Sequence, residues 1–187
     1  MIIGIQGEKG SSNERACIEF CKKHKIHDYQ IKYLISTKNV LKELKQGKID
    51  LGTFAVKSSG GGLVKETKEA VKKYSFDKVD EINLQMDHAL LGIKKSKKEC
   101  YKKIVSHPQA LKEHKAYLKK EYPHAKFVEA KDTALPARKL KEGEYNDRTI
   151  VIAPKACARI YSLRIIEKTL PANKEYFTTF YLVKNLN

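Results

Sequence analysis

The sequence predicts an α/β protein of two lobes, and three observations lead to this prediction. Short apolar runs alternate with segments of helical period, which is the pattern of βα units around a parallel sheet. At about residues 81–93 an extended stretch longer than its neighbours interrupts this series, and a second βα series follows it. The chain then closes with another extended segment that no helix follows. Two βα series joined by long extended segments are typical of a two-lobed binding protein with a ligand cleft between the lobes.

The first series places a helix after each of three strands. The expected strands cover residues 1–6, 29–35 and 50–56, and the expected helices run from about Ser12 to Lys25, from Thr37 to about Gly47, and over 63–74. Thr37 is a favourable capping residue and Gly47 a favourable helix terminator. A βαβαβα order implies a parallel sheet with right-handed crossovers.

The second series repeats this alternation before the chain becomes extended again. Its expected strands cover residues 102–105, 125–130 and 149–153, its expected helices lie within 106–123, 133–143 and 154–161, and the closing extended segment covers 175–183. We assign residues 1–80 and 164–187 to a first lobe. Residues 81–163 form the second.

Composition excludes membrane proteins and disulfide scaffolds. No stretch approaches the roughly 20 apolar residues of a membrane helix, and Glu8 and Lys9 interrupt the apolar start too early for a signal peptide. We therefore expect a cytoplasmic protein. Four cysteines are too few for a disulfide framework in a chain of 187 residues, so we expect reduced and mostly packed thiols at Cys17, Cys21, Cys100 and Cys157.

A formal charge of +16 raises the question of nucleic-acid binding, because Lys and Arg neutralise phosphates. The lysines are spread along almost every segment, however, and aromatic residues are not interleaved with them as in a stacking platform. Arginine, the usual reader of guanine edges, occurs only at Arg15, Arg138, Arg148, Arg159 and Arg164. We interpret the lysines as a solvated surface and do not expect a nucleic-acid partner.

Neither a metal nor a cofactor is expected. Cys17, Cys21 and His24 fall on one face of a helix with His27 near its end, but small cysteines at this spacing are more often core residues than zinc ligands. The stretch SSGGGLVK lacks the Gly-Lys-Ser/Thr ending of a phosphate loop, and GIQGEKG is not a dinucleotide fingerprint.

The junctions between strands and helices are rich in small and hydroxyl residues. Examples are GEKGSSN, KSSGGG, SHPQ, KDT and APK. Helix N-termini present unpaired N–H groups and the positive end of the helix dipole, so several of them around a cleft favour a small carboxylated ligand. The same residues are also ordinary caps and turns, and this alternative remains open.

Ser106–Leu111 reads Ser-His-Pro-Gln-Ala-Leu, which resembles a segment of the prephenate dehydratases and the related arogenate dehydratases. Further stretches resemble this family in the same order: GIQGEKGSSNERA its opening strand and turn, EINLQMDHALLG a strand, KDTALPA a helix start, and IVIAPKACARIYSL a strand and helix. The resemblance covers nearly the whole chain. It implies a two-lobed, periplasmic-binding-protein-like (type II) fold with the ligand cleft between the lobes.

The resemblance also implies an activity. Family members are lyases that remove CO2 and water from prephenate to give phenylpyruvate in phenylalanine biosynthesis, without a cofactor and usually as homodimers. Aromatisation drives the reaction, so the enzyme mainly positions a small dicarboxylate and helps hydroxide leave. Many members continue into a phenylalanine-sensing ACT domain. The chain stops after its last strand, so we expect the catalytic domain alone, with no feedback control within this polypeptide.

The catalytic signature that the resemblance implies lies in the last strand, where the family has Thr-Arg-Phe. Thr178 and Phe180 match it, which makes Thr178 the expected acid for the departing hydroxyl, whereas Thr179 stands in place of the arginine that holds a substrate carboxylate. A second departure lies in FAVKSSGGG, which resembles the family's Pro-Ile-Glu-Asn-Ser segment. Ser59 matches the serine, but Lys57 replaces the glutamate, and we expect Lys57 to supply the missing positive charge as a point charge.

The family pattern carries three further residues onto this chain. Ser106 and Gln109 are expected to bond substrate oxygens, and Thr133 to cap its helix toward the cleft; plain helix capping is the alternative role for all three. The expected substrate-binding set is therefore Lys57, Ser59, Ser106, Gln109, Thr133, Thr179 and Phe180.

Two functions remain open at the level of sequence. The first is a prephenate or arogenate dehydratase with Thr178 as general acid. The second is a small-carboxylate binding or sensing protein that keeps the cleft but has lost the chemistry, since Thr179 marks a missing charged residue. Nucleic-acid binding through the basic surface ranks third.

Overall fold

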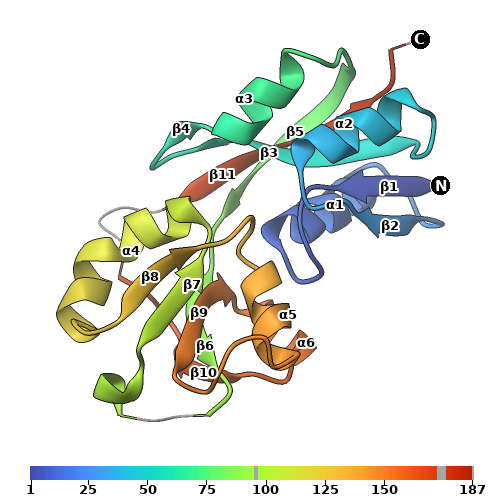
Figure 1. Ribbon diagram of the computed structural model, residues 1–187. Helices are drawn as coiled ribbons and strands as arrows, with labels where there is room; N and C mark the ends of the chain where they lie inside the picture. The colour runs from blue at the N-terminus through green and yellow to red at the C-terminus, as the bar shows by residue number, and fades with distance from the viewer. Residues whose placement is uncertain (95–96, 172–175, 187) are drawn as a thin grey trace. The chain divides into compact units, whose positions relative to one another are not determined.

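The computed structural model describes residues 1–94, 97–171 and 176–186, and the chain divides into two compact units (Figure 1). Unit 1 comprises Met1–Glu8, Ser12–Met86 and Tyr176–Asn187, and unit 2 comprises Lys9–Ser11 and Asp87–Glu175. Each unit has its own sheet with helices packed on it. The predicted α/β class with two lobes is confirmed.

The sheet of unit 1 has the strand order β2-β1-β3-β11-β5, and β4 pairs with β3. The first three strands run parallel, as their βα connections require, whereas β11 is antiparallel to both β3 and β5. The strands are β1 (Ile2–Ile5), β2 (Gln30–Tyr33), β3 (Leu51–Ser58), β4 (Gly62–Leu63), β5 (Asp77–Gln85) and β11 (Phe177–Lys184). The last strand of the chain therefore lies inside the first sheet, between β3 and the edge strand β5.

The helices of unit 1 are α1 (Ser12–Lys23), α2 (Thr37–Lys45) and α3 (Lys65–Val71). The N-cap of α2 is Ser36, next to Thr37 near which the cap was expected, and the Ser36 hydroxyl accepts a hydrogen bond from the Asn39 N–H at 3.2 Å. Gly47 follows the end of α2 with a φ of 65°, a left-handed conformation that glycine adopts without strain. The predicted stop at Gly47 is confirmed.

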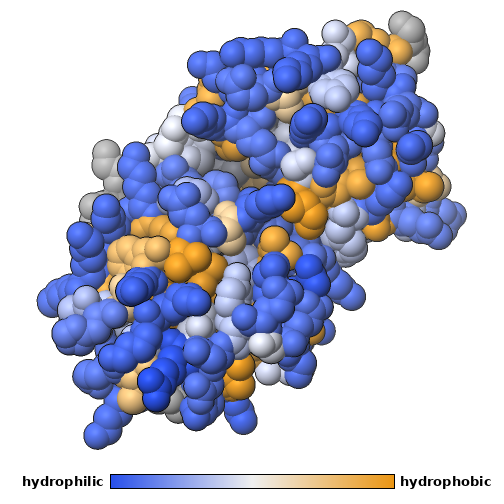
Figure 2. All heavy atoms as spheres, viewed as in Figure 1, coloured by the Kyte–Doolittle hydropathy of each residue, from blue (hydrophilic) through white to orange (hydrophobic). Residues whose placement is uncertain are grey.

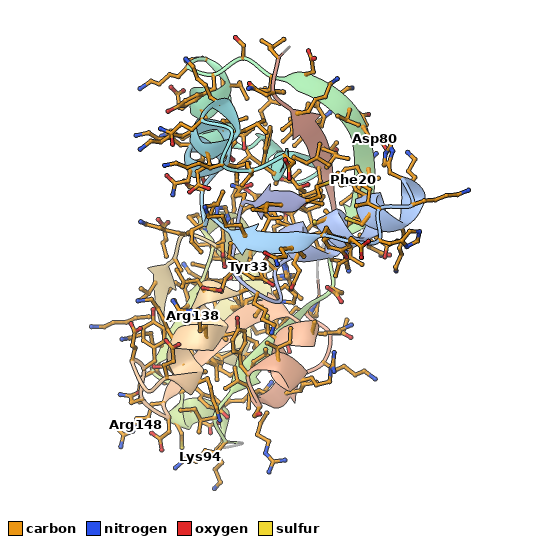
Figure 3. All side chains as sticks on the ribbon, turned by 90° about the vertical axis from the view of Figure 1, so that its right-hand side faces the viewer. Phe20, Tyr33, Asp80, Lys94, Arg138 and Arg148 are labelled. Atoms are coloured by element: carbon orange, nitrogen blue, oxygen red, sulfur yellow. The ribbon has the colours of Figure 1, made fainter. Side chains whose placement is uncertain are left out.

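Side chains of β11 alternate between the two faces of this sheet. Phe180 and Leu182 pack with Phe20 of α1, which is labelled in Figure 3. Tyr181 and Val183 belong to the core that α2 and α3 cover. Because successive strand residues point to opposite faces, this division identifies one face of the sheet as the α1 side and the other as the α2/α3 side.

Unit 2 is built around a sheet of strand order β10-β6-β9-β7-β8. Its strands are β6 (His88–Gly92), β7 (Lys103–Ser106), β8 (Lys126–Glu129), β9 (Thr149–Pro154) and β10 (Arg164–Glu167), and its helices are η1 (Lys98–Cys100), α4 (Pro108–Glu121), α5 (Leu135–Lys141) and α6 (Ala156–Ile160). One core lies between the sheet and α4, and the other packs α5 and α6 against the sheet.

The boundaries of the two units differ from the assigned lobes in three places. Lys9–Ser11 belong to unit 2, although they lie in the stretch assigned to the first lobe. The extended stretch at 81–93 divides into β5 of unit 1 and β6 of unit 2, so residues 81–86 belong with the first sheet. Residues 164–171 belong to unit 2, because β10 pairs antiparallel with β6. Neither β10 nor the short β4 is among the predicted strands.

Polar side chains dominate the face shown in Figure 2, in keeping with a solvated lysine-rich surface. Cys17, Cys21 and Cys157 are buried, whereas Cys100 is exposed. The prediction that the cysteines are mostly packed is confirmed. In the described part of the chain, no helix has the length and apolar character that crossing a membrane requires.

Candidate active site

The two threonines of the last strand point to opposite faces of the sheet. Thr178 is only 7% exposed and shares the α1 side with Phe180, two residues further along β11. Thr179 is half-buried and lies on the α2/α3 side with Tyr181. Adjacent hydroxyls in the sequence are thus separated by the thickness of the sheet.

Each threonine has its own neighbours on the flanking strands. Thr178 lies between Ser58 of β3 and Leu84 of β5, whereas Thr179 lies between Lys57 and Asn83. The Thr179 hydroxyl donates a hydrogen bond to Asn83 Oδ1 at 2.6 Å. Because directly opposed residues place their side chains on the same face about 5 Å apart, the exposed Lys57 side chain starts next to Thr179 and away from Thr178.

Ser59 holds the end of β11 to the end of β3. Its N–H donates to the Phe177 carbonyl at 2.9 Å, and its hydroxyl accepts from the Phe177 N–H at 3.0 Å. The neighbouring Ser58 hydroxyl accepts from the Gly61 N–H at 3.0 Å in the turn that follows. Both serines therefore fix the backbone around Thr178.

Phe180 is 1% exposed and packs in the core against Ala16, Phe20 and Leu182. Truncating such a ring leaves a cavity and costs about 3–5 kcal/mol of folding free energy. The structure therefore gives Phe180 a packing role at the position where the family pattern implies substrate contact.

Ser106 and Gln109 lie at the junction between β7 and α4. The Ser106 side chain is fully buried, and its hydroxyl donates to the Ile152 carbonyl at 2.7 Å. His107 is the N-cap of α4, with Nδ1 accepting from the Gln109 N–H at 3.2 Å, and burial lowers the pKa of this imidazole. The Gln109 side chain donates to Glu113 Oε1 at 3.0 Å. The helix cap at this junction is thus His107, not Ser106 or Gln109.

Thr133 does not cap α5, contrary to the prediction. The helix begins at Leu135, and Asp132 Oδ1 accepts from the N–H groups of Ala134 and Leu135 at 2.5 and 2.6 Å. A carboxylate accepts such bonds better than a hydroxyl and also interacts favourably with the positive end of the helix dipole. Asp132 therefore takes the role that sequence analysis assigned to Thr133.

The predicted residues form one group in each unit. Lys57, Ser59, Thr178, Thr179 and Phe180 gather where β3 meets the start of β11. Ser106 is the last residue of β7, Gln109 follows β7 and Thr133 follows the parallel strand β8, so all three lie at the same edge of the second sheet.

The family model that matches this chain is the prephenate dehydratase model, over residues 3–187. The chain belongs to the prephenate dehydratase family. A prephenate dehydratase of Methanocaldococcus jannaschii is 30% identical over 177 residues, which cover 94% of this chain and 61% of that protein. The chain spans between 38% and 61% of the length of the first curated relatives that it matches.

Solved structures of low sequence identity share the fold. The prephenate dehydratase of Arthrobacter aurescens, solved with L-Phe, superposes with a TM-score of 0.82 at 18% identity, covering 100% of this chain and 60% of that one. A putative methionine-binding lipoprotein of Bacillus subtilis gives a TM-score of 0.51 at 12% identity, covering 98% of this chain and 83% of that one. The periplasmic-binding-protein-like fold class is therefore confirmed.

The two departures from the prephenate dehydratase pattern meet in this structure. Lys57 and Thr179, the positions at which the resemblance implies a glutamate and an arginine, lie directly opposite each other. A glutamate opposite an arginine is a favourable cross-strand pair, whereas a lysine opposite an arginine is a repulsive one. Opposite Thr179, Lys57 instead faces an uncharged hydroxyl.

Two polar residues that bond to β11 or to its neighbour β5 have no clear marker in the sequence. Asn83 forms the hydrogen bond to Thr179, and only the polar alternation of β5 hints at it. Arg15 of α1 donates through Nη2 to the Gln85 carbonyl, beside the cross-strand partner of Thr178. No local pattern marks Arg15, because its place beside β5 follows from the packing of α1. Among the described residues, no cluster of three His, Cys, Asp or Glu side chains could hold a metal ion.

Proposed function

We propose that this chain is a prephenate dehydratase, a carbon–oxygen lyase that decarboxylates and dehydrates prephenate to phenylpyruvate. Thr178 carries this proposal. Thr178 matches the acid position that the family resemblance implies, and its side chain is almost excluded from water. It lies between β3 and β5, and Ser59 ties the start of its own strand, β11, to the end of β3. A buried hydroxyl in a fixed position is preorganised to donate a proton in the transition state.

The reaction needs little more than this proton donor and residues that bind and orient the substrate. As the ring carboxylate leaves as CO2, its bonding electrons enter the ring and expel the hydroxyl group, which the Thr178 proton converts to water. Solvent then returns a proton to Thr178. Formation of the aromatic ring makes the reaction thermodynamically favourable. The protein contributes proton donation and the orientation of the substrate.

The experiment that tests the proposal follows phenylpyruvate formation from prephenate. General acid catalysis is worth roughly 10²- to 10⁴-fold, so Thr178→Ala should lower kcat by about that factor, while Thr178→Ser should retain most of it. Thr149→Ala is the matched control, since it removes a buried threonine hydroxyl in the other unit. Wild-type turnover no faster than the spontaneous reaction would sink the proposal.

We also propose that Lys57 supplies the charge that the arginine supplies elsewhere in the family, because it lies beside Thr179 on an adjacent strand. A single ammonium replaces a bidentate guanidinium, so this contact is the weaker of the two. Unchanged turnover in Lys57→Ala, beside Lys184→Ala as a control at the other end of β11, would rule this role out.

The replacement of arginine by Thr179 favours one competing function, a small-carboxylate binding or sensing protein on the same fold. A charge-assisted hydrogen bond contributes about 1.5–3 kcal/mol, so its loss can end catalysis while leaving a ligand site. Tight binding of prephenate without turnover would support this alternative. Arogenate assayed in parallel separates the two dehydratase activities, because it carries an amine where prephenate has a ketone.

A further inference from the structure

Beside the two threonines, β3 contains one residue more than its partner β11. Phe180 is opposite Ala55, whereas Thr179 is opposite Lys57, so Val56 is the extra residue of a β-bulge. Through the same positions β11 keeps a regular register with β5 on its other side. The irregularity therefore belongs to β3.

This bulge determines the face of the sheet on which Lys57 lies. Val56 packs against the core on the α2/α3 side, and Lys57 follows it on the same side, opposite Thr179. In a regular strand successive side chains point to opposite faces, so without the bulge Lys57 would lie opposite Thr178, on the α1 side. The bulge thus decides which of the two threonines has the ammonium group beside it.

Two side chains hold the backbone of Ala55, the residue just before the bulge. β1 pairs with β3 only as far as Thr53, so the backbone of Ala55 lies beyond the end of that ladder. Gln6 Oε1 accepts a hydrogen bond from the Ala55 N–H at 2.9 Å, and the Thr67 hydroxyl donates one to the Ala55 carbonyl at 2.6 Å. These side chains supply the hydrogen bonds that a neighbouring strand would otherwise make.

A polar network fixes the orientation of both side chains. The Glu66 carboxylate accepts from Gln6 Nε2 at 3.2 Å and from the Thr37 N–H at 2.7 Å, which turns the amide oxygen of Gln6 toward Ala55. The Thr67 hydroxyl has a single proton and gives it to Ala55, so the Thr37 hydroxyl, 2.8 Å away, is the donor in their contact. Gln6, Thr37 and Thr67 are all buried, and leaving a buried polar group without its partner is costly.

We propose that Gln6 and Thr67 act as positioning residues for Lys57. By holding Ala55 they fix the bulge of β3, and the bulge keeps the Lys57 side chain beside Thr179. The consequence for substrate binding rests on the proposed function, because it assumes that Lys57 supplies the carboxylate-binding charge. The consequence for the register of β3 is independent of any activity.

An opposite-charge pair reports this register by stability alone. Lys57→Glu and Thr179→Arg place two charges directly opposite each other only when the bulge is present. In urea unfolding, each substitution should then raise the effect of the other by about two- to fivefold in the unfolding equilibrium constant. We expect this coupling to disappear when Thr67→Val or Gln6→Met is added, because Ala55 then loses one of its two bonds. Thr67→Ser keeps the hydroxyl and should preserve the coupling.

Thr53→Val is the matched control for Thr67→Val. Thr53 is fully buried in β3, two residues before Ala55, and its hydroxyl has no hydrogen-bond partner among the described residues. The same exchange at this position should leave the coupling unchanged. Equal couplings in the Thr67→Val and Thr53→Val backgrounds would overturn the proposal, even if Thr67→Val lowers stability. If Thr67→Val does not fold, Gln6→Met decides by the same comparison.

Turnover of prephenate separates this inference from the proposed function. Thr67→Val should raise KM by no more than Lys57→Ala does, and the double variant should lie within about twofold of Lys57→Ala, because both changes act on one contact. A KM that rises by the product of the two single effects would contradict a role through Lys57. Wild-type protein without turnover would remove the proposed function, and the coupling would still decide whether Gln6 and Thr67 fix the register.

Discussion

At the scale of single residues, the pairing of Lys57 with Thr179 can be tested by placing two opposite charges at these positions. Thr179→Arg alone places two cations opposite each other, whereas Thr179→Arg with Lys57→Glu creates an opposite-charge pair. In urea unfolding, we expect the free energy of unfolding of the double variant to exceed the value obtained by adding the effects of the two single substitutions by roughly 0.5–1 kcal/mol. Thr179→Arg with Lys184→Glu is the control, because Lys184 is about 16 Å further along β11 and should give additive effects. Additivity in the Lys57 cycle as well would show that the two positions are not coupled.

The sequence reveals both departures from the motif but not their contact. Lys57 and Thr179 lie far apart in the chain, and their register depends on an extra residue in β3, where Phe180 is opposite Ala55 while Thr179 is opposite Lys57. A bulge of one residue changes which side chains face each other, and no residue near Val56 marks this bulge in the sequence. The place of Arg15 is hidden for a similar reason, since it depends on how α1 packs across β5.

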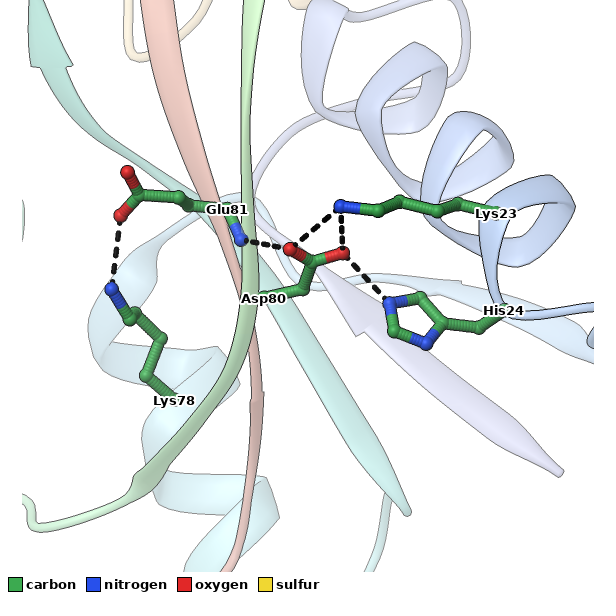
Figure 4. Close-up of polar contacts among 5 residues, drawn as sticks. All are labelled: Lys23, His24, Lys78, Asp80 and Glu81. Carbon is green, nitrogen blue, oxygen red and sulfur yellow. Dashed lines mark hydrogen bonds and ion pairs between the residues drawn. The ribbon is translucent and has the colours of Figure 1, made fainter.

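At the scale of elements, α1 is held to β5 by a charged cluster as well as by its apolar face. Asp80 accepts hydrogen bonds from Lys23 at 2.9 Å and from the Glu81 N–H at 2.8 Å, and its carboxylate lies 2.8 Å from His24 Nε2 (Figure 4). These donors, Lys23 first, lower the pKa of Asp80 to about 2. The cluster ties the C-terminal end of α1 to the edge of the sheet, and thereby orients the helix that carries Arg15.

This pKa shift predicts a dependence of stability on pH. An aspartate with a folded-state pKa of about 2 and an unfolded value of about 3.9 stabilises the fold above pH 4, and this contribution disappears as the pH falls toward 2. Because the Lys23 side chain is 57% exposed, we expect Asp80→Asn to lower the free energy of unfolding by only about 1 kcal/mol at pH 7, and by nothing near pH 2. Urea titrations at both pH values measure this, with Glu81→Gln as a control whose partner is the exposed Lys78. The same loss at both pH values would exclude a role for Asp80 ionisation.

Most helices and strands could be predicted from hydrophobic periodicity alone, and there are physical reasons why the others could not. The βα units were predictable because buried strands and amphipathic helices carry strong hydrophobic patterns. β10 was not predicted because it has only four residues, of which two are exposed, and therefore carries a weak hydrophobic pattern. Its pairing with β6 defines it as a strand. The division of residues 81–93 into β5 and β6 likewise depends on the partners of each half, β11 in one unit and β9 in the other.

At the scale of the whole molecule, the net charge of +16 is the dominant electrostatic fact. The ion pairs of the described residues are mostly exposed, and such pairs contribute about 0–1 kcal/mol each, so like-charge repulsion should outweigh them. Sodium chloride screens this repulsion: between about 0.01 M and 0.1 M the Debye length falls from about 30 Å to about 10 Å. We therefore expect the melting temperature at pH 7 to rise by a few degrees over this range. Near pH 9.6, the isoelectric point, the net charge vanishes and the rise should disappear. A melting temperature that falls with salt at pH 7 would mean that specific ion pairs, rather than the distributed lysines, govern the stability of this protein.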